Sequence, residues 1–367
     1  MSGNRIIRQY VVCIAAFLLS LLSTQASAII LGNTEVPRDS FLVFLCAGNS
    51  NMAGRVSDHD TGGIHPKLWK YNVDTAVEGS LHEWVPAQTP FCWDGPGGGP
   101  GMPLLRKMLQ EYPEYYFGVM VHGKSGRFRY ACRDAFQKGQ DGYETVMTCA
   151  MREVGNVTYA AIITMIGDVE TQNESYVSSW DHINNFAQDV SSMVSAMRQD
   201  LNLPDLPYLQ TEIPYGDGTH DPTRDACIEL RRQISLIPEM VSNAAIISSE
   251  GISLRDGNHY SYKGYLMWAD RVSEVLRQNN WAPGQQVRVA NSHPPSPLQF
   301  QTPSQGQRRL LIAGKRSDRS VITTMNSFKV NGSVYPRKAD NQKYSAGIML
   351  HTTITNTGSV PRQGEGN

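Results

Sequence analysis

Three residues of the chain have types and positions that could support nucleophilic catalysis. Ser50 follows the apolar segment 41–47, and Gly48 between them permits a tight turn. A serine hydroxyl is a poor nucleophile unless a base removes its proton. His259 is the candidate base, because Asp256, three residues earlier, can hold the ring in the tautomer that leaves Nε2 free. The combination predicts attack on a carbonyl carbon, as in ester hydrolysis.

Each of these signals is weak when it stands alone. A serine that follows a strand often only caps the next helix. His122, at the end of another apolar segment, is the one rival to His259 as the base. A strand-end serine and an Asp-x-x-His motif at the two ends of one domain are together more specific.

The apolar segments between these residues predict the scaffold. Five short runs without regular alternation indicate strands buried on both faces, at residues 41–47, 116–122, 159–166, 207–213 and 244–249. Helical spacing lies between them, at residues 183–200 and 226–241, and a last helix at 261–278 has Ser261 as its cap. This order predicts a three-layer α/β/α sandwich with a mainly parallel five-stranded sheet. Active sites of such sheets lie at the carboxyl ends of the strands, which is where Ser50 and His259 are expected.

Two blocks of the sequence resemble a known superfamily. Residues 48–55, Gly-Asn-Ser-Asn-Met-Ala-Gly-Arg, resemble the first block of SGNH hydrolases, which have a flavodoxin-like fold. The resemblance is strongest to the sialate O-acetylesterase-like branch and carbohydrate esterase family 6, where Gln usually precedes the serine. Residues 256–261 are similar to the last block of that branch, and residues 121–125 stand where members have a glycine-rich second block. The resemblance covers about residues 40–280.

The resemblance implies a role for each matching residue. Ser50 would be the nucleophile, His259 the general base and Asp256 the residue that orients the base. The backbone amides of Ser50 and Gly123 would stabilise the oxyanion. We expect no cofactor, and no metal, since no cysteine pair has the CxxC spacing of a zinc site.

The third block departs from the family pattern. Members carry Gln-Gly-Glu there, whereas this chain has Ile166, Gly167 and Asp168, followed by Val169. The neutral amide is replaced by an apolar side chain, so we expect one oxyanion donor fewer. Because the acid of this block supports the histidine in some members, Asp168 is the alternative to Asp256.

These observations favour a secreted serine esterase that removes acetyl groups from a sugar or polysaccharide. A lipid or aryl esterase and a non-catalytic carbohydrate-binding protein on the same fold are the alternatives. Three tryptophans expected in loops, Trp69, Trp84 and Trp93, could stack on a sugar or bind an acyl chain. The glycine-rich segment 95–101 lacks the ending of a phosphate-binding loop and is expected to be structural or to shape the substrate site. We expect no nucleic-acid partner.

The N-terminus has the layout of a secretory signal peptide, with cleavage after Ala28. We therefore expect a secreted, extracellular or periplasmic protein with no membrane span. Of the cysteines that remain, Cys46 is expected to be a buried free thiol and Cys132 to pair with Cys149.

The C-terminal part differs in composition from the rest of the chain. The expected organisation is a signal peptide (1–28), an SGNH hydrolase domain (29–280), a Pro- and Gln-rich linker (281–308) and a basic extension (309–367). From residue 281 onward, 11 Lys and Arg against 3 Asp and Glu give a charge of +8, in a chain whose total is −1. We expect a small all-β unit or a partly disordered extension, and its charge could hold an acidic polymer.

Overall fold

The computed structural model of the chain describes residues 28–57, 62–73, 81–92, 97–124, 131–172, 179–217, 220–285, 327–330 and 333–336. The chain divides into two units, Met1–Ser296 and Pro297–Asn367. Residues 1–27 of the expected signal peptide and most of the expected linker lie outside the described residues, so both assignments stay predictions.

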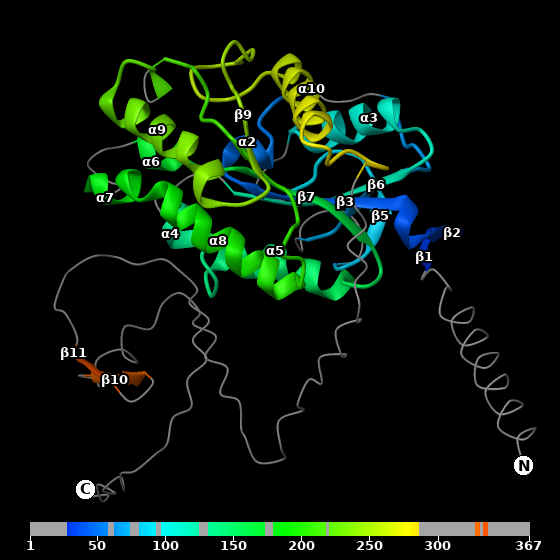
Figure 1. Cartoon of the computed structure of the whole chain (residues 1–367), viewed down its shortest axis with the longest axis horizontal. Helices are drawn as coiled ribbons and strands as arrows, with labels where there is room; N and C mark the ends of the chain where they lie inside the picture. Colours follow the sequence, from blue (N-terminus) through cyan, green and yellow to red (C-terminus); the bar gives the residue numbers. More distant parts are fainter. Residues whose placement is uncertain are drawn as a thin grey trace, which may run out of the picture. The chain divides into compact units, whose positions relative to one another are not determined.

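The first unit is built on one seven-stranded sheet (Figure 1). Its spatial order is β5 (Trp84–Pro86), β4 (Leu68–Tyr71), β6 (Tyr116–Gly123), β3 (Phe41–Gly48), β7 (Thr158–Met165), β8 (Tyr208–Thr211) and β9 (Ala244–Ile247). All neighbouring strands are parallel except β5, which runs antiparallel to β4. The mainly parallel sheet is confirmed, and all five predicted strands are present.

The prediction of only five strands was wrong, because β4 and β5 were missed. Both strands are short, and the buried Lys70 interrupts the apolar pattern of β4. Its ammonium group donates hydrogen bonds to the carbonyls of Gln88 and Pro90, at 2.9 and 2.8 Å. These bonds satisfy the charged group inside the protein, an arrangement that hydropathy alone does not reveal.

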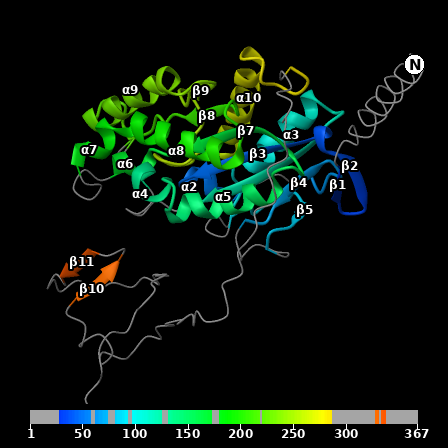
Figure 2. The ribbon, with the colours of Figure 1, turned by 60° about the horizontal axis from the view of Figure 1, so that its bottom comes forward.

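Helices cover both faces of the sheet, as Figures 1 and 2 show, and the predicted three layers are confirmed. One face carries α3 (Gly101–Glu111) and α10 (Tyr262–Gln278), and the other carries α5 (Asp141–Glu153), α8 (Phe186–Leu201) and α9 (Asp225–Met240). Successive residues of β3 enter opposite cores: Val43 packs on the α5–α8–α9 side and Phe44 on the α3–α10 side. A strand buried on both faces must be apolar throughout, which explains its sequence. The Ser261 side chain caps α10 by accepting from the Gly264 N–H, as predicted.

Short elements complete the first unit: β1 (Ala28–Leu31), β2 (Thr34–Pro37), η1 (Arg38–Ser40), α2 (Ser50–Ala53), α4 (Cys132–Ala135), α6 (Asp168–Gln172) and α7 (Ser179–Asn184). The described part of the second unit is an antiparallel pair, β10 (Ser327–Val330) and β11 (Ser333–Pro336). This pair lies in the basic extension, for which a small all-β unit or a partly disordered extension is expected. The rest of the extension, residues 309–326, 331–332 and 337–367, lies outside the described residues.

Strand register brings the sequence blocks together at one edge of the sheet. Gly48, at the end of β3, is paired with Gly123 of β6 on one side and with Met165 of β7 on the other. A Cβ at position 48 would lie 2.4 Å from the Met165 carbonyl oxygen, so only glycine fits there. The segments that follow β3, β6 and β7 therefore start side by side.

Two side-chain predictions fail in the core. The predicted disulfide is wrong, because Cys132 is a buried free thiol. Trp69 and Trp84 are not loop residues; they lie in β4 and β5, where Trp84 packs edge-on against Phe41 at a ring distance of 4.7 Å. Trp93 lies outside the described residues. Cys46 is a buried free thiol, as predicted.

Candidate active site

The side chains of Ser50, His259 and Asp256 form one continuous hydrogen-bonded row. Ser50 Oγ lies 3.0 Å from His259 Nε2. On the other side of the ring, His259 Nδ1 lies 3.0 and 3.1 Å from the two carboxylate oxygens of Asp256. The predicted contact between serine and histidine is therefore present although 209 residues separate them in sequence. This is the order hydroxyl, imidazole, carboxylate that activates a serine.

A local turn holds the carboxylate of Asp256 under the imidazole. Its Oδ1 accepts hydrogen bonds from the backbone N–H groups of Asn258 and His259, at 2.9 and 2.7 Å. Partial burial acts to raise the pKa of Asp256, but these N–H groups and the His259 ring outweigh burial and hold the pKa below its usual value. The carboxylate is thus anionic at neutral pH, as a partner for an imidazolium must be.

Asp168, the alternative partner, makes no hydrogen bond to the imidazole ring of His259. Its Oδ2 accepts a hydrogen bond from Asn51 Nδ2 at 3.1 Å, and its Oδ1 lies 3.7 Å from His220 Nε2. Burial raises the pKa of Asp168, although His220, Asn51 and His259 oppose the shift. The carboxylate beside His259 Nδ1 is therefore that of Asp256, whereas Asp168 is connected to the His259 segment only through Asn51.

Sequence reasoning missed two residues of this arrangement. No sequence pattern marks His220, yet it is fully buried beside Asp168, and burial lowers its pKa. Asn51 was noted only as part of the first block, although its side chain bonds both to Asp168 and to the His259 segment. The rival histidine, His122, is buried in β6, and the partner of Ser50 is His259.

The backbone around Gly123 offers a donor near Ser50. N–H groups alternate along β6: that of Phe117 donates to Lys67 on the β4 side, and that of Lys124 donates to Gly48 of β3. The N–H of Gly123 therefore points to the β4 side, past Met120, the last residue paired with β4. The N–H of Ser50 lies in the first turn of α2, where no acceptor exists within the helix. These two groups are available for a developing oxyanion.

The third block supplies no polar side chain to replace the family's amide. Ile166 is packed in the core on the α5–α8–α9 side, and Val169 packs against Ala131. Gly167 adopts φ +117°, which favours glycine, and turns the chain from β7 into α6. The third block was expected to lack the amide of the family, and the structure has two buried apolar side chains, Ile166 and Val169, in this block.

The described part of the glycine-rich segment packs against the chain that follows α2. Gly98 and Val56 exchange backbone hydrogen bonds, and a Cβ at Gly97 would lie 2.1 Å from the Val56 carbonyl oxygen. A Cβ at Gly54 would similarly meet Gly98. The glycines permit this close backbone contact, which favours the structural interpretation of the segment.

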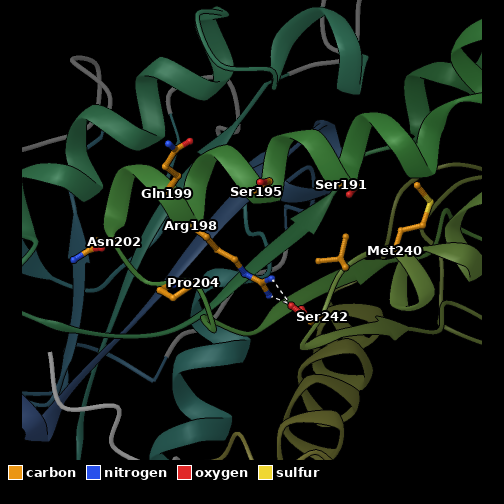
Figure 3. Close-up of a pocket in the computed structure, with 9 residues that line it drawn as sticks. Ser191, Ser195, Arg198, Gln199, Asn202, Pro204, Met240 and Ser242 are labelled. Carbon is orange, nitrogen blue, oxygen red and sulfur yellow. Dashed lines mark hydrogen bonds between the residues drawn. The ribbon is translucent and has the colours of Figure 1, made fainter. Parts of the chain in front are cut away.

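A pocket of about 520 Å³ lies elsewhere, between the C-terminal half of α8 and the segment before β9 (Figure 3). Arg198 and Ser242 line it, and Arg198 donates hydrogen bonds to the carbonyls of Leu206 and Ser242 at 2.9 and 2.8 Å. Because Ser242 precedes β9 whereas His259 follows it, the pocket lies at the amino ends of the strands, opposite the Ser50–His259 pair.

The described residues contain neither a metal cluster nor a membrane-spanning helix. No group of three or more His, Cys, Asp or Glu side chains is arranged to hold a metal ion there. Within the same residues, no helix is both long enough and apolar enough to cross a bilayer.

Comparison with known proteins agrees with the fold. The chain is similar to the probable carbohydrate esterase At4g34215 of Arabidopsis thaliana, with 25% identity over 239 residues, which is 59% of this chain and 82% of that protein. The crystal structure of the Arabidopsis protein superposes with a TM-score of 0.52 at 17% identity, covering 65% of this chain and 98% of that one. The crystal structure of NanS gives a TM-score of 0.53 at 14% identity, covering 68% and 98%.

The family profile described as carbohydrate esterase, sialic acid-specific acetylesterase, matches residues 40–278. This range contains the whole sheet, the Ser50–His259–Asp256 row and Gly123. The chain therefore belongs to the sialic acid-specific acetylesterase family of carbohydrate esterases, and is a hydrolase that acts on ester bonds.

Proposed function

We propose that this protein is a secreted serine esterase that removes acetyl groups from a carbohydrate. The observation that carries the proposal is the 3.0 Å separation of Ser50 Oγ and His259 Nε2, with Asp256 on the far side of the ring. The family and the Arabidopsis relative, a probable carbohydrate esterase, support an acetylated sugar as the substrate.

In the first step, Ser50 Oγ attacks the carbonyl carbon of the acetyl group while His259 Nε2 takes the hydroxyl proton. The negative charge on the carbonyl oxygen is stabilised by the N–H groups of Ser50 and Gly123. His259 then gives its proton to the sugar oxygen, the C–O bond breaks, and the sugar leaves as an alcohol. The acetyl group remains on Ser50.

In the second step, His259 removes a proton from water, which attacks the acetylated Ser50. Collapse of the tetrahedral intermediate returns the proton to Ser50 Oγ and releases acetate. Asp256 stabilises the imidazolium that forms in each step and keeps its ring oriented. No other co-reactant is needed.

Two other functions predict different results. A non-catalytic carbohydrate-binding protein would have no need of an aligned serine, histidine and carboxylate, so the intact row supports an enzyme. A lipid esterase would need an apolar cleft for the acyl chain. Trp69 is buried in β4, and Trp84 packs on Phe41 at the amino end of β3, the end opposite Ser50. The positions of these two rings therefore support neither an apolar cleft for a lipid nor sugar stacking at the site.

Steady-state hydrolysis tests the proposal. The full-length protein and its Ser50→Ala variant are assayed with para-nitrophenyl acetate, para-nitrophenyl palmitate and an acetylated polysaccharide. We expect release of acetate from the first and third substrates, and for Ser50→Ala a turnover number lower by about 10⁴-fold or more. Ser192→Ala, an exposed serine on α8, is the control and should remain fully active. Preference for the palmitate would support the lipid alternative, and binding of the polysaccharide without hydrolysis would support the binding protein.

The site of action is part of the proposal. A signal peptide ending at Ala28 would leave Ile29 as the first residue of the secreted protein. N-terminal sequencing of protein recovered from the culture medium checks this: retention of the first 28 residues would contradict it.

A further inference from the structure

Asn51 is bonded to both neighbours of His259 along the chain. Its Nδ2 donates to the backbone carbonyl of Asn258 at 3.0 Å, and its Oδ1 accepts from the backbone N–H of Tyr260 at 3.0 Å. The amide thus holds the peptide on each side of His259. Because Asn51 directly follows Ser50, it connects the proposed nucleophile to the segment that carries the base.

The amide of Asn51 can satisfy these contacts in only one orientation. The second Nδ2 hydrogen is directed to Asp168 Oδ2 at 3.1 Å. A flipped amide would place its oxygen against the carboxylate of Asp168 and the carbonyl of Asn258, and its NH₂ group against the N–H of Tyr260. All three contacts would become repulsive. Asp168 therefore fixes the orientation of the side chain.

The surroundings make this arrangement rigid. The side chains of Asn51 and Asp168 are buried, and Asp168 is flanked on its other side by the fully buried His220. The backbone carbonyl of Asn51 accepts a further hydrogen bond from the Tyr265 hydroxyl at 2.8 Å, which ties α2 to α10. In a buried site, where water cannot replace a lost partner, such bonds are costly to break.

The row of Ser50, His259 and Asp256 depends on this connection. Asp256 belongs to the same loop as His259, so it orients the ring but cannot fix the distance from that loop to Ser50. Asn51 can, because it belongs to α2 with Ser50. We propose that Asn51 is a positioning residue that sets the distance between Ser50 and His259, and that Asp168 orients the Asn51 amide. This inference rests on the proposed function.

The first test is the Asn51→Ala variant, assayed with para-nitrophenyl acetate. A displacement of the His259 loop by about 1 Å should lower kcat about 10²-fold. KM should stay within about threefold, because Asn51 is buried below the site and is not expected to contact substrate. Thermal unfolding verifies that the variant is folded. A folded variant with kcat within about threefold of the wild type overturns the inference.

Asn51→Asp is the second variant and keeps the test valid if Asn51→Ala does not fold. The new carboxylate can still accept from Tyr260 N–H but cannot donate to Asn258 or Asp168. It would face Asp168, with His220 and His259 nearby, and Asp168 would raise its pKa. When the two neighbouring carboxyl groups share one proton, that proton can again be donated in a hydrogen bond between them. The ratio of variant to wild-type kcat should therefore rise as pH falls from about 8 to about 6. A folded Asn51→Asp variant with the kcat of the wild type at both pH values contradicts a positioning role.

These outcomes are distinct from failure of the proposed function. An active Ser50→Ala variant would contradict the function itself. An inactive Ser50→Ala variant beside a fully active Asn51→Ala variant would contradict only the role of Asn51.

Discussion

Gly123 lies directly against the backbone of Ala53: a Cβ at position 123 would be 2.3 Å from the Ala53 amide nitrogen and 2.5 Å from its Cα. Strand β6 and helix α2 are therefore packed backbone to backbone. The contact brings the proposed oxyanion donor at Gly123 next to the helix that begins with Ser50, and only glycine allows it.

Substitution of this glycine should damage the site and the fold together. In Gly123→Ala, the added methyl group meets backbone atoms that cannot rotate away, so α2 must shift. We expect a loss of stability of about 1–3 kcal/mol, typical of overpacking. We also expect kcat to fall by about 10²-fold or more, as when one oxyanion donor is removed. Thermal unfolding and steady-state assays measure the two effects. An alanine variant with unchanged stability and unchanged kcat would contradict the tight backbone contact between Gly123 and Ala53.

The two acids near the site should respond differently to the same isosteric change. Asp256→Asn removes the charge that stabilises the imidazolium and lets the wrong tautomer form, so kcat should fall about 10⁴-fold. Asp168→Asn still has an oxygen that can accept from Asn51, and the loss should be smaller by about 10-fold or more. The kcat values of the two variants with para-nitrophenyl acetate show which carboxylate is the principal partner of His259. A larger loss for Asp168→Asn would assign Asp168, and not Asp256, as the principal carboxylate.

Glu170 should make the stability of the protein depend on pH. Burial raises its pKa from 4.5 to about 7, with Asp168 and Asp134 adding to the shift, while the backbone N–H groups of Cys132 and of Glu170 itself oppose it. The folded state therefore binds a proton more tightly than the unfolded state. The stability that this group contributes is complete below about pH 4.5 and is lost as pH rises to about 7.

Glu170→Gln should remove this dependence, because glutamine can still accept from the Cys132 N–H without becoming charged. Relative to the wild type, the variant should gain up to roughly 3 kcal/mol between about pH 5 and about pH 8. Urea unfolding at both pH values measures the difference. Glu239→Gln, an exposed position at the end of α9, is the control. An equal effect of both substitutions at the two pH values would contradict this origin of the pH dependence.

Much of the fold could be predicted from the sequence because its strands are buried on both faces. Such strands must be continuously apolar, and the five that met this condition were found. The strand β4 was missed because Lys70 is satisfied by carbonyls that only the folded chain brings to it. The disulfide prediction failed because the spacing of two cysteines in the sequence does not show where their side chains point. Cys132 is a buried free thiol in the core.

In the candidate site, too, contacts between residues close in sequence could be predicted, and contacts between residues far apart in sequence could not. Asp256 and His259 are three residues apart, so a single turn joins them and the sequence pattern predicts it. The bond from Asn51 to Asp168 spans 117 residues and depends on the register of β3 and β7. His220 reaches Asp168 from yet another segment. No local pattern marks these contacts; the departure of the third block from the family sequence was the single signal that pointed to Asp168.

The cysteine chemistry of the folded protein follows from burial. Burial raises the pKa of the Cys132 thiol well above its usual value, with Glu170 and Asp189 adding to the effect. Since the thiolate is the reactive form, Cys132 should resist iodoacetamide in the native protein and react after unfolding. Mass spectrometry of unreduced peptides measures this. A peptide pair linked through Cys132 and Cys149 would contradict the structure.

The basic extension is expected to affect retention on an acidic polymer but not turnover. Removal of the chain after Ser296 keeps the whole first unit, including the buried Ala282, and deletes only the second. Hydrolysis of para-nitrophenyl acetate should be unchanged. Binding to an acidic polysaccharide should weaken in dilute buffer, where the Debye length is long, and not at about 1 M salt. Equal retention of both proteins in dilute buffer would leave the extension without this role.

The central claim is that Ser50 carries the acetyl group during the reaction. Rapid acid quenching of the protein with para-nitrophenyl acetate, followed by peptide mass spectrometry, tests it most directly. We predict an acetylated peptide containing Ser50 in the wild type, accumulation of this species in a variant that slows deacylation, and its absence in Ser50→Ala. Turnover with acetylation at another residue, or undiminished turnover by Ser50→Ala, would contradict the claim.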